Sequence, residues 1–402
     1  MSESLSFDGA LSEAQLAWRD EVRKFIATEV DDQLLAEYGR EHELGRGPRV
    51  HEFYRRMAER GWNATTWPKE HGGLEMSSLN RLILMDELAY AGAPRLEYAA
   101  HNLAPIIMKH GTPANQQMWL PKIRSGEFNF ALGYSEAEAG SDLANLRTSA
   151  ILHGDEWVIN GEKTWNSRAH VSTHEWLLAR TDQTLGRHRG LSIIIVPMNT
   201  RGIEIQPLWT WGDERTNLVF FNDVRVPADH LVGEANAGWS YVVEALANER
   251  AAIGVSGDVR RLFDDFSEYC RSTMRGGIAL AQDPDVSVAL AELFVEVDIQ
   301  RLMCFEVASL ADAGEDTTIA GTMLKVWTSE LRAKIADTAM AVQGMDGQLD
   351  SRDPRAPFGG RAEAAYRWAP IHRFGGGANE ILRDIIAQRG LGLPRASRRL
   401  SS

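Results

Sequence analysis

Residues Tyr366 to Leu393 read YRWAPIHRFGGGANEILRDIIAQRGLGL and contain three consecutive glycines, Gly375, Gly376 and Gly377. After the glycines we expect a helix with Asn379 near its N-terminal cap and one apolar face, made of Ile381, Leu382, Ile385 and Ile386. The N-terminus of a helix presents free N–H groups and the positive end of the helix dipole, which suits a phosphate or a polarised carbonyl. A flexible turn before a helix explains the same residues, so the rest of the chain must decide between the two readings.

Long helices precede this stretch from Gly233 onward. Apolar residues recur at helical spacing in three segments, around Val242 to Ile253, Val286 to Val297 and Ile319 to Ile335. Together with the closing stretch, these segments predict a bundle of four antiparallel helices.

The period of the pattern changes in the middle of the chain. Short β-favouring runs separated by Gly, Asp and Asn turns predict strands at 156–159, 175–179, 192–196 and 218–221. Residues 1–127 are helical in pattern, with Ser12 and Gln15 forming a capping box and Pro113 opening a later helix. The predicted architecture is therefore α+β and multidomain: an N-terminal all-α domain (1–127), a middle β-barrel or β-sandwich domain (128–233) and a C-terminal four-helix bundle (234–402).

Composition excludes several classes of protein. The 402 residues carry a net charge of −13, which argues against a general nucleic-acid binder. The chain has only two cysteines, no visible signal peptide and no apolar run long enough to span a membrane, so we expect a soluble, cytoplasmic protein. His170 and His174 lie four residues apart without a third ligand, so we expect no metal site. The sequence also lacks a Gly-x-Ser-x-Gly elbow, a P-loop and a Gly-x-Gly-x-x-Gly turn after a strand.

Two stretches of the middle domain have the composition of a ligand site. Leu132 to Asp142 (LGYSEAEAGSD) combines small residues with hydroxyl donors, namely Ser135, Gly140 and Ser141. Gly161 to Ser167 (GEKTWNS) places Trp165 beside two small polar residues, and this indole can stack on a flat ring while its neighbours bond the ring's edge. A polar turn and an ordinary core tryptophan are the structural alternatives.

A carboxylate lies on the apolar stripe of the helix after Gly233. Val242, Leu246, Glu249 and Ile253 fall at i, i+4, i+7 and i+11. Such a carboxylate is either paired or has a pKa raised by desolvation, and a raised pKa suits a general base. A salt bridge to an arginine of another helix and a catalytic base remain equally open at this point.

In this order, these stretches resemble the acyl-CoA dehydrogenase flavoprotein family over nearly the whole chain. The resemblance is carried by segments 67–73 (WPKEHGG), 135–142 (SEAEAGSD), 161–165 (GEKTW), 221–227 (FNDVRVP) and 379–383 (NEILR). It implies FAD between the middle domain and the bundle, an acyl-CoA substrate, an electron-transfer flavoprotein as electron acceptor, a role in fatty acid metabolism and lipid degradation, and a tetramer built as a dimer of dimers.

The resemblance also implies roles for single residues. Cofactor contacts are expected from Leu132, Tyr134, Ser135, Gly140, Ser141, Trp165, Asn166, Ser167, Gly377 and Ala378, and substrate contacts from Ser141, Arg250 and Gly375. Many members of the family hold their catalytic glutamate where this chain has Gly376. A minority hold it on the first helix of the bundle, just before an arginine, and Glu249-Arg250 matches that position. Glu249 would then remove the α-proton of the thioester while the β-hydrogen passes as hydride to flavin N5, and the Gly376 N–H would stabilise the developing oxyanion.

Some departures from the family pattern fall at the dinucleotide end of the expected site. The Arg-x-x-Phe-Gly segment is replaced by Cys270 to Gly277 (CRSTMRGG), the segment Gln343 to Gly347 is abbreviated, and Ala378 replaces a hydroxyl residue. These features are similar to heteromeric actinobacterial members, such as those acting on steroid side chains, in which each subunit supplies part of a shared FAD site. A homo-oligomer and a hetero-oligomer therefore remain open. So do a flavin-dependent oxidase or monooxygenase on the same fold and a partner subunit that completes another subunit's site.

Overall fold

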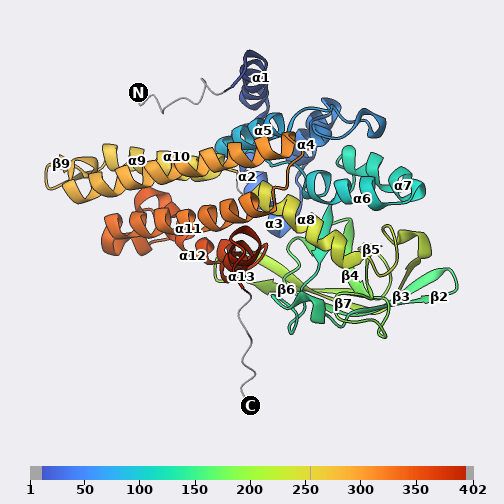
Figure 1. Cartoon of the computed structure of the whole chain (residues 1–402). Helices are drawn as coiled ribbons and strands as arrows, with labels where there is room; N and C mark the ends of the chain where they lie inside the picture. The colour runs from blue at the N-terminus through green and yellow to red at the C-terminus, as the bar shows by residue number, and fades with distance from the viewer. Residues whose placement is uncertain (1–10, 254, 395–402) are drawn as a thin grey trace. The chain divides into compact units, whose positions relative to one another are not determined.

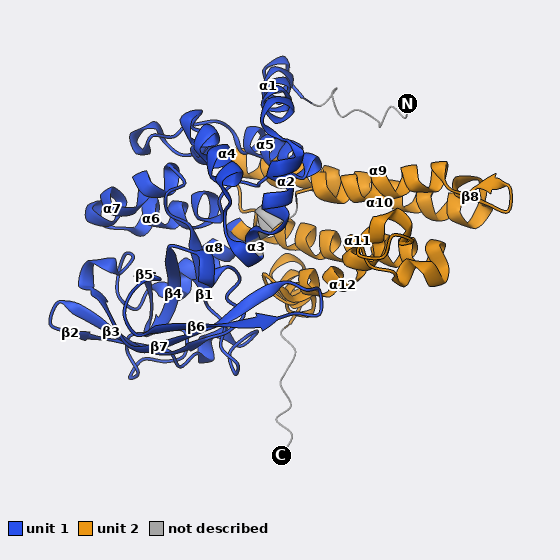
Figure 2. Cartoon of the chain, turned by 180° about the vertical axis from the view of Figure 1, so that it is seen from behind, with its two compact units in different colours: residues 1–248 blue, residues 249–402 orange. Residues whose placement is uncertain are grey.

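The computed structural model describes residues 11–253 and 255–394, without the side chains of residues 42 and 250–253. The chain divides into two compact units, residues 1–248 and residues 249–402, shown in different colours in Figure 2. Each unit is described by itself.

The first unit begins with helices. Their bounds are α1 Glu13–Glu29, α2 Asp32–Gly39, α3 Glu41–Leu44, α4 Pro48–Glu59, α5 Ser78–Ala91, α6 Ala104–His110 and α7 Pro113–Arg124. The predicted capping box is present: the Ser12 hydroxyl accepts a hydrogen bond from the Gln15 N–H, and the Gln15 side chain accepts one from the Ser12 N–H. Pro113 opens α7 as predicted, because a missing N–H is no loss in the first turn of a helix.

A seven-stranded sheet follows within the first unit (Figure 1). Its strands are β1 Phe130–Gly133, β2 Ser149–His153, β3 Glu156–Lys163, β4 His174–Arg180, β5 Leu191–Pro197, β6 Ile203–Trp209 and β7 Arg215–Pro227. The order is β1-β4-β2-β3-β7-β6, and β5 pairs with the other edge of β4. β1 and β2 are both parallel to β4 and meet it at its opposite ends, at residues 174–177 and at Arg180.

Two apolar cores hold this unit together. One core joins α6, α7, β4 and β5 and contains Trp119, Trp176 and Val242. The other lies within the sheet and contains Trp157, Phe221 and Val224. Alternate residues of β4 and β5 face the two cores, which explains why these strands are apolar almost throughout.

The second unit is helical. Its helices are α9 Gly257–Ser272, α10 Pro284–Asp312, α11 Thr318–Gln343, α12 Arg361–Phe374 and α13 Asn379–Ile385, and a short hairpin of β8 Met274–Arg275 and β9 Ile278–Ala279 follows α9. α9, α10, α11 and α12 share one core, which includes Phe263, Leu293, Leu331 and Ala362. This is the predicted four-helix bundle.

The membership of the bundle differs from the sequence-based assignment in one respect. Helix α8 (Gly238–Ile253) spans the boundary of the two units, and its Val242 packs in the core of the first unit. The bundle core instead contains α9, whose apolar face includes Val259 and Phe266. An apolar stripe predicts that a helix is buried, but it does not say against which core.

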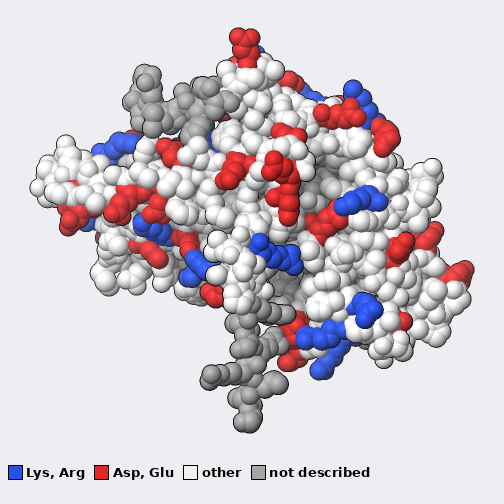
Figure 3. All heavy atoms as spheres, in the orientation of Figure 1, with Lys and Arg blue, Asp and Glu red and all other residues white. Residues whose placement is uncertain are grey.

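The face of the molecule in Figure 3 carries charges of both signs. Acidic and basic side chains are interspersed on the face shown in Figure 3, without a broad basic field. Among the described residues, no helix combines the length and the apolarity that crossing a membrane requires. Cys270 and Cys304 are both buried, and neither forms a disulfide within the described part of the chain.

Candidate functional site

The loop after β3 presents two side chains to the surface. Trp165 is 58 % exposed and Ser167 is exposed, whereas Asn166 between them is completely buried. Trp165 and Arg168 both have a positive φ, of 61° and 65°. A non-glycine residue in this conformation costs about 1–3 kcal/mol and persists only where its surroundings enforce it. The loop, residues 164–171, is therefore held in place by its neighbours.

A buried ion pair lies beneath the start of the loop. Lys163, which is fully buried, donates to the Tyr134 carbonyl at 3.0 Å and to Glu136 at 2.9 Å. Glu136 also accepts from the N–H groups of Arg147 and Thr148. Burial raises the pKa of Glu136, but Lys163 and these backbone donors outweigh that effect and hold the pKa below its usual value. The Thr164 N–H donates to the Ser135 carbonyl at 2.9 Å, so this pair fixes both candidate stretches together.

Three buried polar side chains hold the middle of the loop. The Asn166 amide donates to Glu175 of β4, and the Asn166 N–H donates to the Asn217 carbonyl at 3.0 Å. Asn217 returns a hydrogen bond from its amide to the Asn166 carbonyl at 2.8 Å. Burial raises the pKa of Glu175 to about 8, against the opposing effects of Asn166 and Lys163. Burial therefore favours the uncharged form of Glu175.

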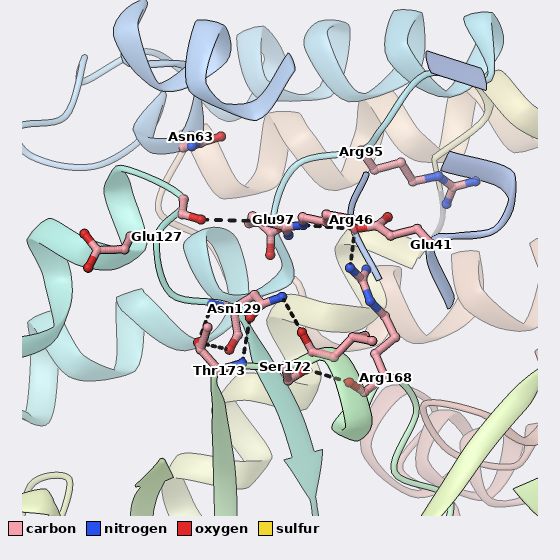
Figure 4. Close-up of polar contacts among 12 residues, drawn as sticks. Glu41, Arg46, Asn63, Arg95, Glu97, Glu127, Asn129, Arg168, Ser172 and Thr173 are labelled. Atoms are coloured by element: carbon pink, nitrogen blue, oxygen red, sulfur yellow. Dashed lines mark hydrogen bonds and ion pairs between the residues drawn. The ribbon is translucent and has the colours of Figure 1, made fainter. Parts of the chain in front are cut away.

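The far end of the loop is tied to the N-terminal helices. Arg168 reaches Glu41 of α3 at 2.5 Å, and Glu41 also binds Arg46 at 3.0 Å (Figure 4). Arg46 pairs in addition with Glu97 and lies over the ring of Tyr54. The side chains of Glu41, Arg46 and Glu97 are nearly inaccessible to solvent, so this charge cluster is a fixed structural anchor.

The stretch from Leu132 to Ser141 divides into buried and exposed parts. Tyr134 is buried in the first core, and Leu132 packs against the same core. A tight turn with reciprocal backbone bonds between Glu136 and Ala139 leaves Gly140 and Ser141 exposed. Of the predicted cofactor residues in this unit, Trp165, Ser167, Gly140 and Ser141 are open to solvent and Ser135 is half-buried. The side chains of Asn166 and Tyr134 are buried, and the Asn166 N–H and carbonyl and the Tyr134 carbonyl are bonded to Asn217 and Lys163.

In the second unit, the glycine turn closes α12 and opens α13. Gly376 and Gly377 have φ values of 68° and 109°, in the region that favours glycine. The N–H groups of Gly375 and Gly377 donate to Ile371 and Phe374, whereas the Gly376 N–H has no acceptor among the residues described. One backbone donor of the turn is thus available to a ligand.

Lys325 of α11 supports this turn. Its buried ammonium donates to the Gly377 carbonyl at 2.7 Å and to the Asn379 side chain at 2.9 Å. Asn379 lies near the helix cap as predicted: Ala378 is the cap and Asn379 is the first helical residue. The Asn379 side chain points inward to Lys325, Ser329 and Glu330, because a buried ammonium needs more acceptors than one carbonyl supplies.

Glu249 lies on α8, two turns after Val242 and on the same face of the helix. Its side chain is half-buried and interacts with a neighbour. Arg250 lies in the same helix, but its side chain is outside the described part of the structure. Within the described residues, no group of three His, Cys, Asp or Glu side chains is arranged to hold a metal ion.

Sequence reasoning missed the buried residues that hold these two loops, namely Glu136, Lys163, Glu175 and Lys325. One signal was present, since Glu175 is a charged residue at the start of the run 175–179 that the pattern assigns to a strand. Lys325 gives no such signal, because a lysine in a long helix is normally on its solvated face.

Comparisons with known proteins agree with this architecture. The N-terminal, middle and C-terminal domain models of acyl-CoA dehydrogenase match residues 12–127, 131–224 and 236–391. Acyl-CoA dehydrogenase FadE26 of Mycobacterium tuberculosis is 37% identical over 392 residues, covering 94% of this chain and 97% of that protein.

Solved structures are similar along almost the full length. The ChsE4-ChsE5 complex from Mycobacterium tuberculosis matches with a TM-score of 0.87 and 36% identity, covering 96% of this chain and 99% of that chain. The Tcur3481-Tcur3483 steroid ACAD matches with a TM-score of 0.87, 32% identity and the same coverage. The chain therefore belongs to the acyl-CoA dehydrogenase family, and it is an FAD-dependent enzyme that dehydrogenates acyl-CoA thioesters.

Proposed function

We propose that Glu249 is the base of this dehydrogenation and that the Gly376 N–H stabilises the thioester oxygen. The available N–H of Gly376 is the observation that carries the proposal, because it is a fixed backbone donor in a turn that has no side chain. Removal of an α-proton places negative charge on the thioester oxygen, and a preorganised donor favours that charge.

The residues of the first unit suit a flavin. An exposed indole offers a flat surface for stacking, and the exposed hydroxyl of Ser167 lies two residues further along the same loop. A side chain at Gly140 would meet open space, so the backbone is accessible there. When bound, FAD accepts the β-hydrogen of the substrate as hydride. We assign Trp165, Ser167, Ser135, Gly140 and Ser141 to holding it.

Glu249 would move the α-proton. The turn of Gly375 to Gly377 contains no carboxylate. Many members of the family hold their base at the position of Gly376, so the base of this chain must come from elsewhere. Glu249 is half-buried on the helix that precedes the bundle, where a carboxylate is partly shielded from water yet reachable.

Substitution of Glu249 by Gln tests the assignment. We expect turnover of acyl-CoA to fall by about 10²–10⁴-fold while FAD binding is retained, because a positioned base contributes about that much. The measurement is single-turnover bleaching of the flavin by acyl-CoA. Glu244→Gln on the same helix is the matched control, since Glu244 pairs with Lys109 and His110, and it is expected to keep turnover within a few-fold. Equal turnover in Glu249→Gln and the wild type would refute the base assignment.

A different partner subunit is the second part of the proposal. The names of two similar structures describe assemblies of two chains, ChsE4-ChsE5 and Tcur3481-Tcur3483, and the second is called a steroid ACAD. This chain lacks the family's Arg-x-x-Phe-Gly segment, and the β8–β9 hairpin occupies that part of the sequence. We therefore propose a hetero-oligomer in which the partner completes the dinucleotide end of the FAD site, and an acyl-CoA with a bulky, steroid-like acyl group as substrate.

Purification of the chain alone and together with the product of a neighbouring gene tests the partner. A colourless protein alone and a yellow complex are expected. Full FAD content in the chain alone would contradict the partner, and failure of every acyl-CoA ester to bleach the bound flavin would contradict the dehydrogenase.

A further inference from the structure

Two buried side chains beneath the Trp165–Ser167 loop share an unusual defect in their hydrogen bonding. The Asn166 amide N–H donates to Oε1 of Glu175, but Oε2 of Glu175 and Oδ1 of Asn166 have no partner among the described residues. Both residues are fully buried. A buried acceptor without a donor costs about 1–3 kcal/mol, so two of them on a bonded pair require an explanation.

A proton on Glu175 would supply a donor to this pair. An ionised Glu175 adds only acceptors, whereas a protonated Glu175 has an O–H group that can donate. The surroundings favour the protonated form. Lys163 is the charged group that acts on Glu175, and Glu136 already neutralises its ammonium at 2.9 Å. On β7, the Asn217 amide is within hydrogen-bond distance of both the Asn166 carbonyl and the His170 ring, so it is already engaged by other groups.

The fold makes room for this carboxyl group. A Cβ atom on Gly133 of β1 would lie 2.3 Å from Oε1 of Glu175, so a larger residue in that strand would displace the acid. The adjacent Tyr134 carbonyl receives Lys163 at 3.0 Å. Gly133, Lys163 and Asn166 therefore surround Glu175 from β1, β3 and the loop.

We propose that Glu175 is a positioning residue: as a neutral carboxylic acid bonded to Asn166, it holds the loop in the strained conformation that turns Trp165 and Ser167 outward. The inference rests on the proposed function insofar as those two side chains contact the flavin. Burial of Glu175, which raises its pKa to about 8, agrees with a neutral acid at physiological pH.

Three variants test the proposal without requiring FAD. Gln has the shape and the donor of a protonated Glu, so Glu175→Gln should keep hydrogen exchange of the 164–171 amides near the wild-type rate at pH 7. Glu175→Leu removes the acceptor of the Asn166 amide and the proposed O–H donor, so exchange of the same amides should accelerate at least tenfold. Glu162→Gln, an exposed carboxylate on β3, is the control and should change nothing.

The pH dependence separates a positioning acid from a merely well-packed residue. Between pH 7 and pH 9 the wild-type loop amides should lose protection beyond the intrinsic effect of pH, because Glu175 ionises, while Glu175→Gln should show no such loss. In the FAD-bound protein or complex, the FAD dissociation constant should follow the same pattern, with a rise of about tenfold for the wild type, the size that disruption of one such bond predicts.

Several results would overturn the inference. Exchange as fast in Glu175→Gln as in Glu175→Leu would show that Glu175 acts as an anion, and an unchanged pH response in Glu175→Gln would assign the titration to another group. If Glu175→Leu does not fold, the pH profile of Glu175→Gln decides alone. Absence of FAD binding by the wild type, alone or with a partner, would refute the proposed function and leave the exchange result to decide this inference.

Discussion

The two loops that carry the candidate chemistry have similar buried supports, but one exposes side chains and the other exposes backbone. The Trp165–Ser167 loop of the first unit and the Gly375–Gly377 turn of the second each lie over a fully buried lysine and a buried asparagine. In the first loop, strained backbone turns an indole and a hydroxyl outward. In the second, the absence of side chains leaves a backbone N–H accessible.

The partners of the two lysines in these loops differ in kind. Lys163 forms an ion pair with Glu136, while Lys325 donates to the Gly377 carbonyl and to the side-chain oxygen of Asn379. In both places a buried lysine supports a loop to which we assign part of the chemistry.

Substitution of Lys163 by Met should have the largest effect on stability. It leaves Glu136 as an uncompensated buried carboxylate, so the free energy of unfolding should fall by about 3–5 kcal/mol. Urea denaturation measures this, and Glu136→Gln in the same chain should recover part of the loss. The exposed Lys122→Met is the control, with an expected change below about 0.5 kcal/mol. A loss no greater than that of Lys122→Met would mean that the pair does not support the loop.

The protonation of Glu175 predicts a pH-dependent stability of somewhat smaller size. Below an unfolded-state pKa of about 4.3 both states hold the proton, whereas between that value and the folded-state pKa of about 8 only the folded state does. The stabilising contribution is therefore lost as pH rises through this window. Relative to the wild type, Glu175→Gln should gain on the order of 1–4 kcal/mol between pH 4.5 and pH 8 in chemical denaturation. A constant difference across this range would show that Glu175 is ionised in the folded protein.

Substitution of Lys325 by Met should destabilise the second unit, because the Gly377 carbonyl and the Asn379 side-chain oxygen lose this donor. We expect a loss of about 1–3 kcal/mol in the free energy of unfolding, together with slower dehydrogenation. Lys334→Met on the same helix, which removes an exposed pair with Glu296, should change neither. A loss no greater than that of Lys334→Met would show that Lys325 does not support the glycine turn.

Removal of the indole should have the smallest effect on the fold. Trp165 is 58 % exposed, so Trp165→Ala should leave the melting temperature unchanged, but it should weaken FAD binding by about 0.5–1.5 kcal/mol, the contribution of an aromatic pair. Trp209→Ala, another exposed tryptophan of the same unit, is the control for unspecific loss. Equal FAD affinity in Trp165→Ala and the wild type would argue against stacking.

The pattern of the sequence was sufficient for most of the fold. Short β-favouring runs identify β3, β4, β5 and β7, and the helical period identifies α8, α10 and α11, because each of these elements is apolar on at least one face. Strands β1, β2 and β6 were missed: β1 is only four residues long, and much of β2 and β6 is exposed, so they lack a strong apolar signal. The capping box at Ser12 was predictable because a cap is local in sequence.

What the sequence determined by itself is the order of helical and β segments, the position of the two loops and the resemblance to a family. Tertiary structure alone decided which side chains support these loops. The Arg168–Glu41 bond joins residues 127 positions apart, and Lys325 reaches Gly377 across 52. Burying such polar and charged groups costs desolvation free energy, and only partners placed correctly in three dimensions offset that cost. A local pattern of residues therefore cannot predict these pairs.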